Sequence, residues 1–311
     1  MSRKSFINGK TVFSHRWNFI LPKITDIEIK KIKLINWREK GEFLIYSPLM
    51  IAFLPTSFTL ATTLLMNHQV SWQLLFIIFS SAFLIYSMNR VTDKKEDQIN
   101  VPERLAFTEY YGVIFLLLGV ISFAISLALA LWKNIPTFLI AIMPLLIAIL
   151  YSFFRVKKYL FIKNILIGLG FGCSVIIVGT YYNDLSYLYA PFYILFFLGI
   201  MVNTIVFDIK DIVGDQKEGI VTIPQKFGIH WTKYICGVIL FFCYLIVFNL
   251  INERPYNILL FPYITYVTVY TLFAPKKGEA SWWYYGLCVD GESVPLILGS
   301  LILLLLVPHF T

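Results

Sequence analysis

Residues 112–132 read GVIFLLLGVISFAISLALALW, a stretch of 21 positions without a charged side chain. A helix needs about 20 apolar residues to cross the hydrocarbon core of a bilayer. Comparable runs occur at 43–66, 72–88, 112–132, 136–151, 165–182, 187–207, 234–251, 257–273 and 287–307. Backbone polar groups in lipid must be satisfied within their own segment, so each run is expected to be a helix. The sequence predicts an all-α integral membrane protein with a bundle of about nine transmembrane helices.

Composition supports the same class. The chain is 58% hydrophobic and 14% charged, which excludes an ordinary soluble domain. Its first 40 residues carry ten Lys and Arg residues and no apolar run before a small-residue cleavage site, so they are not expected to be a signal peptide. We expect residues 1–42 to be a basic segment in the cytoplasm or on the membrane surface. Residues 43–311 are predicted to form one polytopic helical bundle.

The distribution of positive charge predicts the orientation. If the nine runs are helices, 24 of the 26 Lys and Arg residues fall in the amino-terminal segment and in alternate loops. Only Lys133 and Arg254 fall on the other side. Cytoplasmic loops carry an excess of cations, so the amino terminus and the loops that hold most of the charge are predicted to be cytoplasmic. This explains the net charge of +8, and no nucleic-acid partner is expected.

Acidic residues are concentrated in two short segments. Nine of the eighteen lie in NRVTDKKEDQINVPER and its continuation to Glu109, or in DIKDIVGDQKEG from Asp208. Asn89, Asp93 and Asp97 recur every four residues, which places three side chains on one face of a helix that continues from the second run. In the second segment the acids Asp208, Asp211 and Asp215 follow the spacing i, i+3 and i+7, which again places them on one face of a helix.

These two faces have the donor chemistry of a magnesium site. Carboxylates held close together repel one another unless a cation joins them. Oxygen ligands without a nearby histidine or thiolate favour Mg²⁺, which binds through one or two carboxylates and the phosphate oxygens of a substrate. The four cysteines and four histidines are scattered and predict no metal site. The competing interpretation is a set of solvated loop charges paired locally with Lys94 and Lys95.

At these positions the sequence resembles the UbiA superfamily of intramembrane prenyltransferases. Its motifs run N-x-x-x-D-x-x-x-D and D-x-x-D-x-x-x-D, and the six residues above match them. The trailing positions also agree, as Asn100, Pro102 and Arg104 after the first motif and Gly219, Thr222 and Pro224 after the second. The resemblance covers the chain from about Phe43 onward. It implies a central cavity within two related four-helix halves and one extra helix.

A third element, YSFFRVKK, resembles the family's tyrosine followed by basic residues. The resemblance implies that Tyr151, Arg155 and Lys157 contact a diphosphate. Lys158 and Lys163 are interpreted instead as cations that follow the distribution of positive charge in cytoplasmic loops.

The resemblance implies Mg²⁺-dependent transfer of an isoprenoid chain from a polyprenyl diphosphate to a lipophilic or aromatic acceptor, within membrane lipid. Metal ligands would be Asn89, Asp93, Asp97, Asp208, Asp211 and Asp215. Catalysis would rest on Asp93, Asp97, Asp211 and Asp215, which would hold the Mg²⁺ that neutralises the leaving diphosphate as the allylic carbon–oxygen bond breaks, and on Arg155, whose positive charge would aid it. Substrate binding would involve Asn89, Lys94, Arg104, Tyr151, Lys157, Asp208 and Lys210.

Several alternatives remain open. Many aromatic-acid members of the family continue with a proline where this chain has Leu105, so a glycerol lipid, a carotenoid or intramolecular cyclisation competes with an aromatic acceptor. A cation-coupled transporter is a different class, but transporter sites lie near the bilayer midplane at broken helices. A prenyl-lipid binding protein without activity is the third. Asp290 and Glu292 either take part in function or cap a helix start, and they are left out of the site.

Overall fold

The structure is a computed structural model that describes residues 43–306 apart from 44, 154–158, 185 and 276–282. The predicted amino-terminal segment 1–42 lies outside the described residues. Residues from Phe43 onward form one compact unit. Its elements are α2 (Pro48–Leu65), α3 (Trp72–Thr92), α4 (Lys94–Asn100), α5 (Pro102–Lys133), α6 (Ile135–Phe153), α7 (Ile162–Tyr182), α8 (Tyr189–Lys217), α9 (Ile223–Glu253), η2 (Pro255–Leu260), α10 (Phe261–Leu272), η3 (Tyr284–Val289), η4 (Asp290–Glu292) and α11 (Ser293–Leu306).

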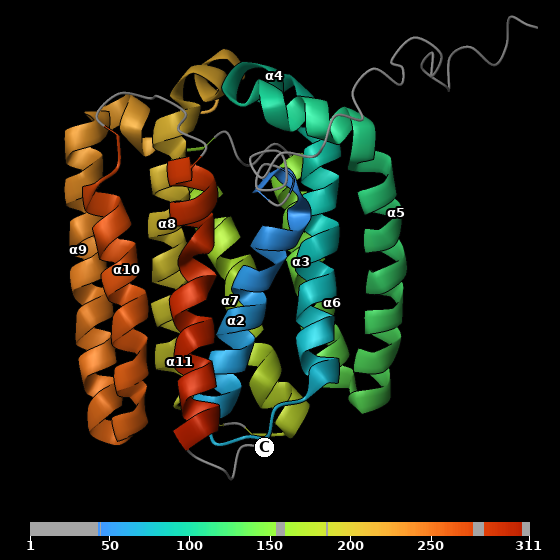
Figure 1. Cartoon of the computed structure of the whole chain (residues 1–311), viewed down its shortest axis with the longest axis vertical. Coiled ribbons are helices and arrows are strands. Elements are labelled where there is room, and N and C mark those ends of the chain that lie inside the picture. The colour runs from blue at the N-terminus through green and yellow to red at the C-terminus, as the bar shows by residue number, and fades with distance from the viewer. Residues whose placement is uncertain (1–42, 44, 154–158, 185, 276–282, 307–311) are drawn as a thin grey trace, which may run out of the picture. The chain divides into compact units, whose positions relative to one another are not determined.

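The long helices lie side by side, and the short α4 crosses one end of the bundle (Figure 1). Each of the nine predicted runs falls on one of these helices, which confirms the all-α membrane bundle. In the described part of the chain, seven helices are long and apolar enough to cross a membrane, and the run Ile135–Tyr151 is a shorter apolar helix. The four helices α2, α3, α5 and α6 precede α7 to α10 in the chain, and α11 follows as the extra helix.

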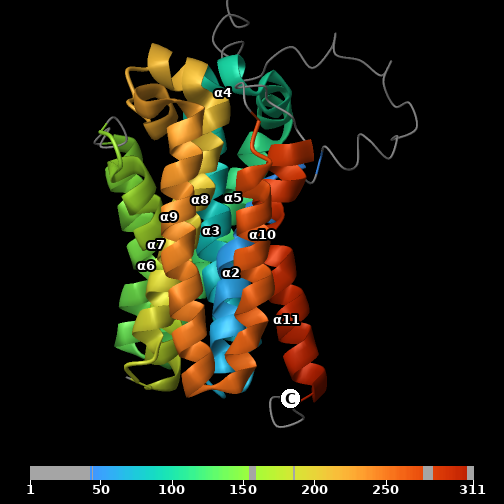
Figure 2. The ribbon, with the colours of Figure 1, turned by 90° about the vertical axis from the view of Figure 1, so that its left-hand side faces the viewer.

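The interior of the bundle centres on α2 and α8, because 67% of each of their membrane windows is buried, against 22% for α5. In two perpendicular views α2 lies in the middle of the bundle (Figures 1 and 2). Phe58 of α2 stacks on Phe196 of α8 with ring centroids 4.2 Å apart. The close approach of α10 to α8 depends on Gly199, since a Cβ there would overlap the hydroxyl of the buried Tyr263.

Several helices extend beyond the predicted apolar runs. α5 begins at Pro102 and α9 at Ile223, whereas the runs begin at 112 and 234. Hydropathy detects the part of a helix inside lipid, so polar turns outside the hydrocarbon region are missed. At the start of α9 the side chain of Gln225 accepts a hydrogen bond from the backbone amide of Thr222 at 3.3 Å. Inside α9 the chain bends at Gly228, whose φ of 78° is readily adopted by glycine.

The first acidic segment differs from its prediction. α3 ends at Thr92, and α4 begins at Lys94 after Asp93, whose ψ of 20° departs from the helix. Asn89 and Asp93 line the same cavity as predicted, but the prediction that one continuing helix also places Asp97 on their face is wrong. α4 contacts α8, as described below, and tertiary contacts of this kind commonly override local helical spacing.

The second acidic segment agrees with its prediction. α8 runs without interruption to Lys217, ten residues beyond the predicted end at 207. Asp208, Asp211 and Asp215 consequently lie on successive turns of one helix at the i, i+3 and i+7 spacing.

Candidate active site

A cavity of about 230 Å³ opens between α2, α3, α6 and α7. Its polar mouth is formed by Asn89, Arg90, Asp93, Arg104 and Tyr151. Deeper in the bundle its wall is largely apolar and includes Pro55, Ile78, Ala82, Pro144, Ile147, Leu166, Ile167 and Phe171. From Ile78 to Asp93 the wall follows α3 over 15 residues, or about 22 Å of helix. The cavity therefore suits an elongated molecule with a polar head and an apolar tail.

The second acidic motif is organised by a lysine from a neighbouring helix. Lys163, in the first turn of α7, places its Nζ 2.8 Å from Asp208 and 3.1 Å from Asp215. Both carboxylates are almost completely buried, at 1% and 2% exposure. Asn164 donates its side-chain amide to Asp208 at 3.1 Å and to Thr204 at 3.0 Å. Buried carboxylates need such partners, and here one ammonium group satisfies two of them.

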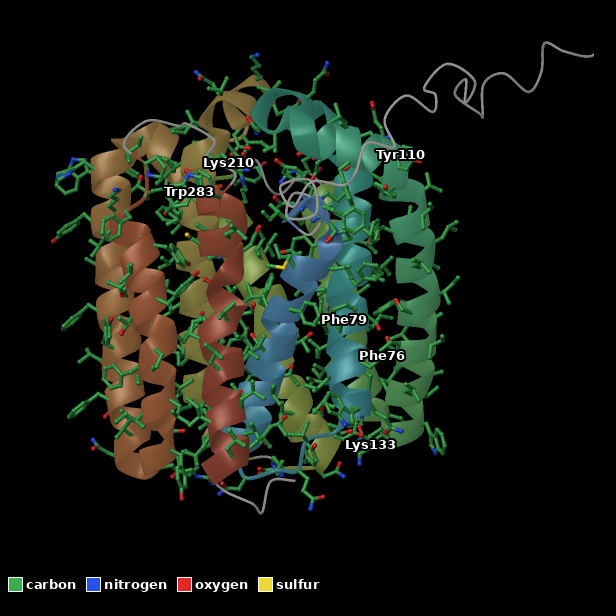
Figure 3. The ribbon with its side chains drawn as sticks, in the orientation of Figure 1. Phe76, Phe79, Tyr110, Lys133, Lys210 and Trp283 are labelled. Carbon is green, nitrogen blue, oxygen red and sulfur yellow. The ribbon has the colours of Figure 1, made fainter. Side chains whose placement is uncertain are left out.

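Asp211 faces a different cation. Lys210 Nζ lies 2.9 Å from Asp211 Oδ1 and 5.4 Å from the centre of the Phe207 ring. Its side chain is mostly buried, so the aromatic ring and the carboxylate replace water around the ammonium group. Figure 3 shows Lys210 at the α4 end of the bundle and Lys133 at the opposite end.

Arg104 and Asp97 form a close two-point ion pair. Arg104 Nε donates to Asp97 Oδ2 at 2.9 Å, and a second guanidinium nitrogen contacts Asp97 Oδ1. Asp97 is 1% exposed and is not part of the cavity wall, whereas Arg104 is. Such a fork fixes the guanidinium plane. In this arrangement Asp97 orients Arg104 at the mouth of the cavity, and this pairing competes with the predicted role of Asp97 as a metal ligand.

The two motif segments are joined by a direct contact. Asn100, at the end of α4, accepts a hydrogen bond from the backbone amide of Gly214 in α8 at 3.1 Å. A side chain at position 214 would overlap the amide of Asn100, so this approach requires glycine. Through this contact the segment that follows the first motif is held beside the second motif.

The charged side chains of the two motif segments lie near one another. Arg104 of the cavity mouth is within electrostatic range of Asp211, and Lys163 is within range of Tyr151. The first motif, the second motif and the tyrosine of the third element therefore meet at the α4 end of the bundle.

The structure places the other predicted site residues in different surroundings. Asn89, Asp93 and Tyr151 line the cavity, whereas Lys94 is exposed on α4. Arg155 and Lys157 lie outside the described residues.

Glu292 and Asp290, the two acids before α11, have different polar neighbours. Glu292 is fully buried and accepts a hydrogen bond from Tyr270 at 2.7 Å. Asp290 lies within electrostatic range of Arg90, Lys210 and Arg104. Glu292 has the surroundings of a buried structural group, while Asp290 faces the cations of the site.

Two residues of this site were not predicted. Lys163 was interpreted as a loop cation that only follows the membrane charge rule, but it joins two aspartates. Arg90 was counted only in the charge distribution, but it lines the cavity. The one sequence signal for Arg90 is its position directly after Asn89. For Lys163 no local signal exists, because its partners are more than 40 residues away.

The donor set fits Mg²⁺ bound together with a phosphate ligand. Between Asp208 and Asp215 a cationic ammonium already occupies the space that separates the carboxylates, so this position stabilises positive charge. Among the residues that the structure describes, no three Asp, Glu, His or Cys side chains are grouped so that they could hold a metal ion by themselves. Mg²⁺ is commonly held by one or two carboxylates and completed by water and substrate phosphates, so a full cage is not required.

Comparison with known proteins identifies the class. The sequence profile of the UbiA prenyltransferase family matches residues 49–287. The chain belongs to this family of intramembrane prenyltransferases, as its two aspartate motifs predicted. The enzyme class and the fold expected from the resemblance are confirmed.

Individual relatives add detail. Over 152 residues the chain is 30% identical to a digeranylgeranylglyceryl phosphate synthase of Methanobrevibacter smithii, a match that covers 45% of this chain and 52% of the relative. Another protein of that name, from Sulfurisphaera tokodaii, is 28% identical over 160 residues, or 50% of this chain and 56% of the relative. The matches span about half the length of these curated relatives.

Solved structures show the same fold. A UbiA homologue from Archaeoglobus fulgidus, bound to GPP and Mg²⁺, superposes with a TM-score of 0.64 at 17% identity over 83% of this chain and 99% of that chain. The apo structure of a UbiA homologue from Aeropyrum pernix K1 has a TM-score of 0.61 at 13% identity, over 81% of this chain and 97% of that chain.

Proposed function

We propose that this protein transfers a prenyl group from a prenyl diphosphate to a lipophilic acceptor. The observation that carries the proposal is the cavity, because a long apolar wall leads to a mouth that bears Asn89, Asp93 and Arg104. The apolar part fits a prenyl chain, and the mouth fits its diphosphate. A solved relative with this fold, from Archaeoglobus fulgidus, was bound to GPP and Mg²⁺.

Mg²⁺ is proposed to be held by Asp93 and by the aspartates of α8, completed by diphosphate oxygens. When bound, it would neutralise the charge that grows on the diphosphate as the allylic carbon–oxygen bond breaks. Arg104, held in place by Asp97, is oriented to donate hydrogen bonds to the same leaving group. Lys163 lies between Asp208 and Asp215, and once Mg²⁺ takes these carboxylates the displaced ammonium group would remain as a second positive charge at this end of the bundle.

The rest of the cavity excludes water from the allylic carbon. Its deep wall carries apolar side chains such as Ile78 and Phe171, which would surround the prenyl chain and offer no nucleophile to the allylic carbon. The acceptor's hydroxyl oxygen forms the new carbon–oxygen bond and loses its proton. The products are the prenyl ether and diphosphate, with the proton released to solvent or to the diphosphate.

For the acceptor we propose a glycerol-based lipid. Two relatives that match about half of this chain are digeranylgeranylglyceryl phosphate synthases. The departure at Leu105 from the aromatic-acid pattern supports the same choice.

The test is product formation by the purified full-length chain with geranylgeranyl diphosphate and Mg²⁺. A prenylated glycerol phosphate and an aromatic acid are offered as alternative acceptors, and product mass is determined. Asp93→Asn and Asp211→Asn remove one charge each and are expected to lower turnover by about 100-fold or more. Glu109→Gln is the matched control, because Glu109 is an exposed acid of α5 outside the cavity wall.

Each result has a defined meaning. A glycerol ether that requires Mg²⁺ supports the whole proposal. A product formed only with the aromatic acid retains prenyl transfer but overturns the lipid acceptor. Turnover that is unchanged in EDTA overturns the role of the metal. No diphosphate release with any donor length, from protein that remains folded, overturns prenyl transfer itself.

We also propose that the α4 end of the bundle faces the cytoplasm. Arg90, Arg104, Lys163 and Lys210 lie in the helix segments at this end, whereas Lys133 lies at the opposite end (Figure 3). Excess positive charge favours the cytoplasmic side. With the four native cysteines replaced by serine, single cysteines introduced at Lys94 and Lys133 test this, because a membrane-impermeant thiol reagent applied to intact cells should label only the second.

A further inference from the structure

Arg90 lies in the last turn of α3, next to Asn89, and lines the mouth of the cavity. Its Nε is buried and has no hydrogen-bond partner. None of the ion pairs within the described part of the chain includes it. Arg90 therefore brings a guanidinium group with an unpaired donor to the one place where the proposed substrate carries negative charge.

The acids near Arg90 do not satisfy this donor. Asp97 and Asp290 are within electrostatic range of Arg90, but neither forms an ion pair with it. Both oxygens of Asp97 are engaged by Arg104. A buried guanidinium without a bound anion is costly, because water no longer solvates its charge and donors.

A cation in the last turn of a helix also interacts favourably with the helix dipole. That interaction needs only a positive charge, and it leaves the buried Nε donor of Arg90 without an acceptor. The planar guanidinium has five donors in a fork that matches phosphate oxygens in pairs. The position inside the cavity mouth and the unpaired donor together favour an anionic ligand over a purely structural role.

We propose that Arg90 binds a phosphoryl group of a substrate at the mouth of the cavity. The proposal rests on the proposed function and names a further binding residue for that reaction. The phosphoryl group belongs either to the diphosphate of the prenyl donor or to the phosphate head group of the lipid acceptor. Both have the same chemistry, and the experiment distinguishes them.

Binding without turnover is measured first. Inorganic pyrophosphate is titrated into the detergent-solubilised full chain by calorimetry, with EDTA and then with Mg²⁺. Arg90→Gln removes the charge and the fork, and Arg90→Lys keeps the charge alone. If Arg90 holds the donor diphosphate, pyrophosphate affinity falls about 10- to 100-fold in Arg90→Gln and by less in Arg90→Lys. Lys133→Gln is the control, since it removes one cation at the opposite end (Figure 3).

Kinetics with the same variants separates the two sources. If the donor is bound, KM for the prenyl diphosphate rises at least tenfold while KM for the acceptor is unchanged. If the acceptor is bound, KM for a phosphate-bearing acceptor rises at least tenfold, KM for its dephosphorylated form is unchanged, and pyrophosphate affinity stays at the wild-type value.

The proposal is overturned when folded Arg90→Gln matches the wild type in both KM values and in pyrophosphate affinity. A chain that shows no transfer at all refutes the proposed function, and pyrophosphate affinity then decides the role of Arg90. Arg90→Lys guards against a folding defect, because a merely structural charge is restored by lysine, whereas a fork that binds phosphate is restored only in part.

Discussion

Replacing Lys163 by methionine tests whether its ammonium group occupies a cation position. In the structure this group lies 2.8 Å from Asp208 and 3.1 Å from Asp215, and both carboxylates are almost fully buried. Removing one partner of a buried ion pair costs about 3–5 kcal/mol, because the remaining charge is left unpaired. With roughly 2–4 °C of melting temperature for each kcal/mol, the apparent midpoint is expected to fall by on the order of 10 °C in EDTA.

The same variant should respond more strongly to metal. Once the ammonium group is gone, Asp208 and Asp215 are free to share a divalent cation. Mg²⁺ at about 100 times its Kd then adds about 2.7 kcal/mol to the free energy of unfolding. In the wild type Mg²⁺ must first displace Lys163 from these carboxylates, so its stabilising effect is expected to be smaller. Thermal unfolding followed by intrinsic fluorescence, in EDTA and in Mg²⁺, measures both effects.

Two further variants make this test specific. Lys133→Met removes a lysine whose Nζ lies 4.4 Å from the centre of the Tyr181 ring. This variant is expected to lose about 0.5–1 kcal/mol of unfolding free energy and to show no change in its response to Mg²⁺. Lys163→Met combined with Asp208→Asn should recover part of the stability in EDTA, because fewer buried charges remain unpaired. The reasoning is refuted if Lys163→Met leaves the midpoint unchanged, or if Mg²⁺ raises the midpoint of wild type and variant equally.

Three other outcomes are expected. Gly214→Ala should push Asn100 away from α8 and lower turnover at least tenfold, and the double variant with Asn100→Ala should be more active than Gly214→Ala alone. Equal activities of the two variants would show that the overlap between the alanine Cβ and the Asn100 amide is harmless. Ser174→Phe should fill the inner part of the cavity and lower kcat/KM for a long prenyl donor at least tenfold relative to a short one, and an unchanged ratio would place the chain elsewhere. Arg104→Lys should lower kcat about 10- to 100-fold at similar stability, because the two-point contact with Asp97 is lost while the charge remains; full activity in this variant would exclude an orienting role for the pair.

The class of the protein follows from its amino-acid sequence. Runs such as 112–132 must be helical in lipid, because every backbone donor and acceptor has to be satisfied inside the segment. The spacing of Asp208, Asp211 and Asp215 also predicted a shared helical face correctly, because these residues lie on one uninterrupted helix. Both are local properties that residue order alone contains.

Tertiary structure decided how the site is assembled. The same periodicity failed beyond Asp93, where α3 ends and α4 begins, and Asn100 at the end of α4 contacts Gly214 of α8. In the sequence Lys163 resembled the other cations of the connecting segments, and only the packing of α7 against α8 shows that it joins two buried aspartates. Local spacing places residues on one face of a helix, but which helix faces meet depends on contacts between distant segments. These contacts determine which charged side chains are paired. They also leave Arg90 with an unpaired donor in the cavity.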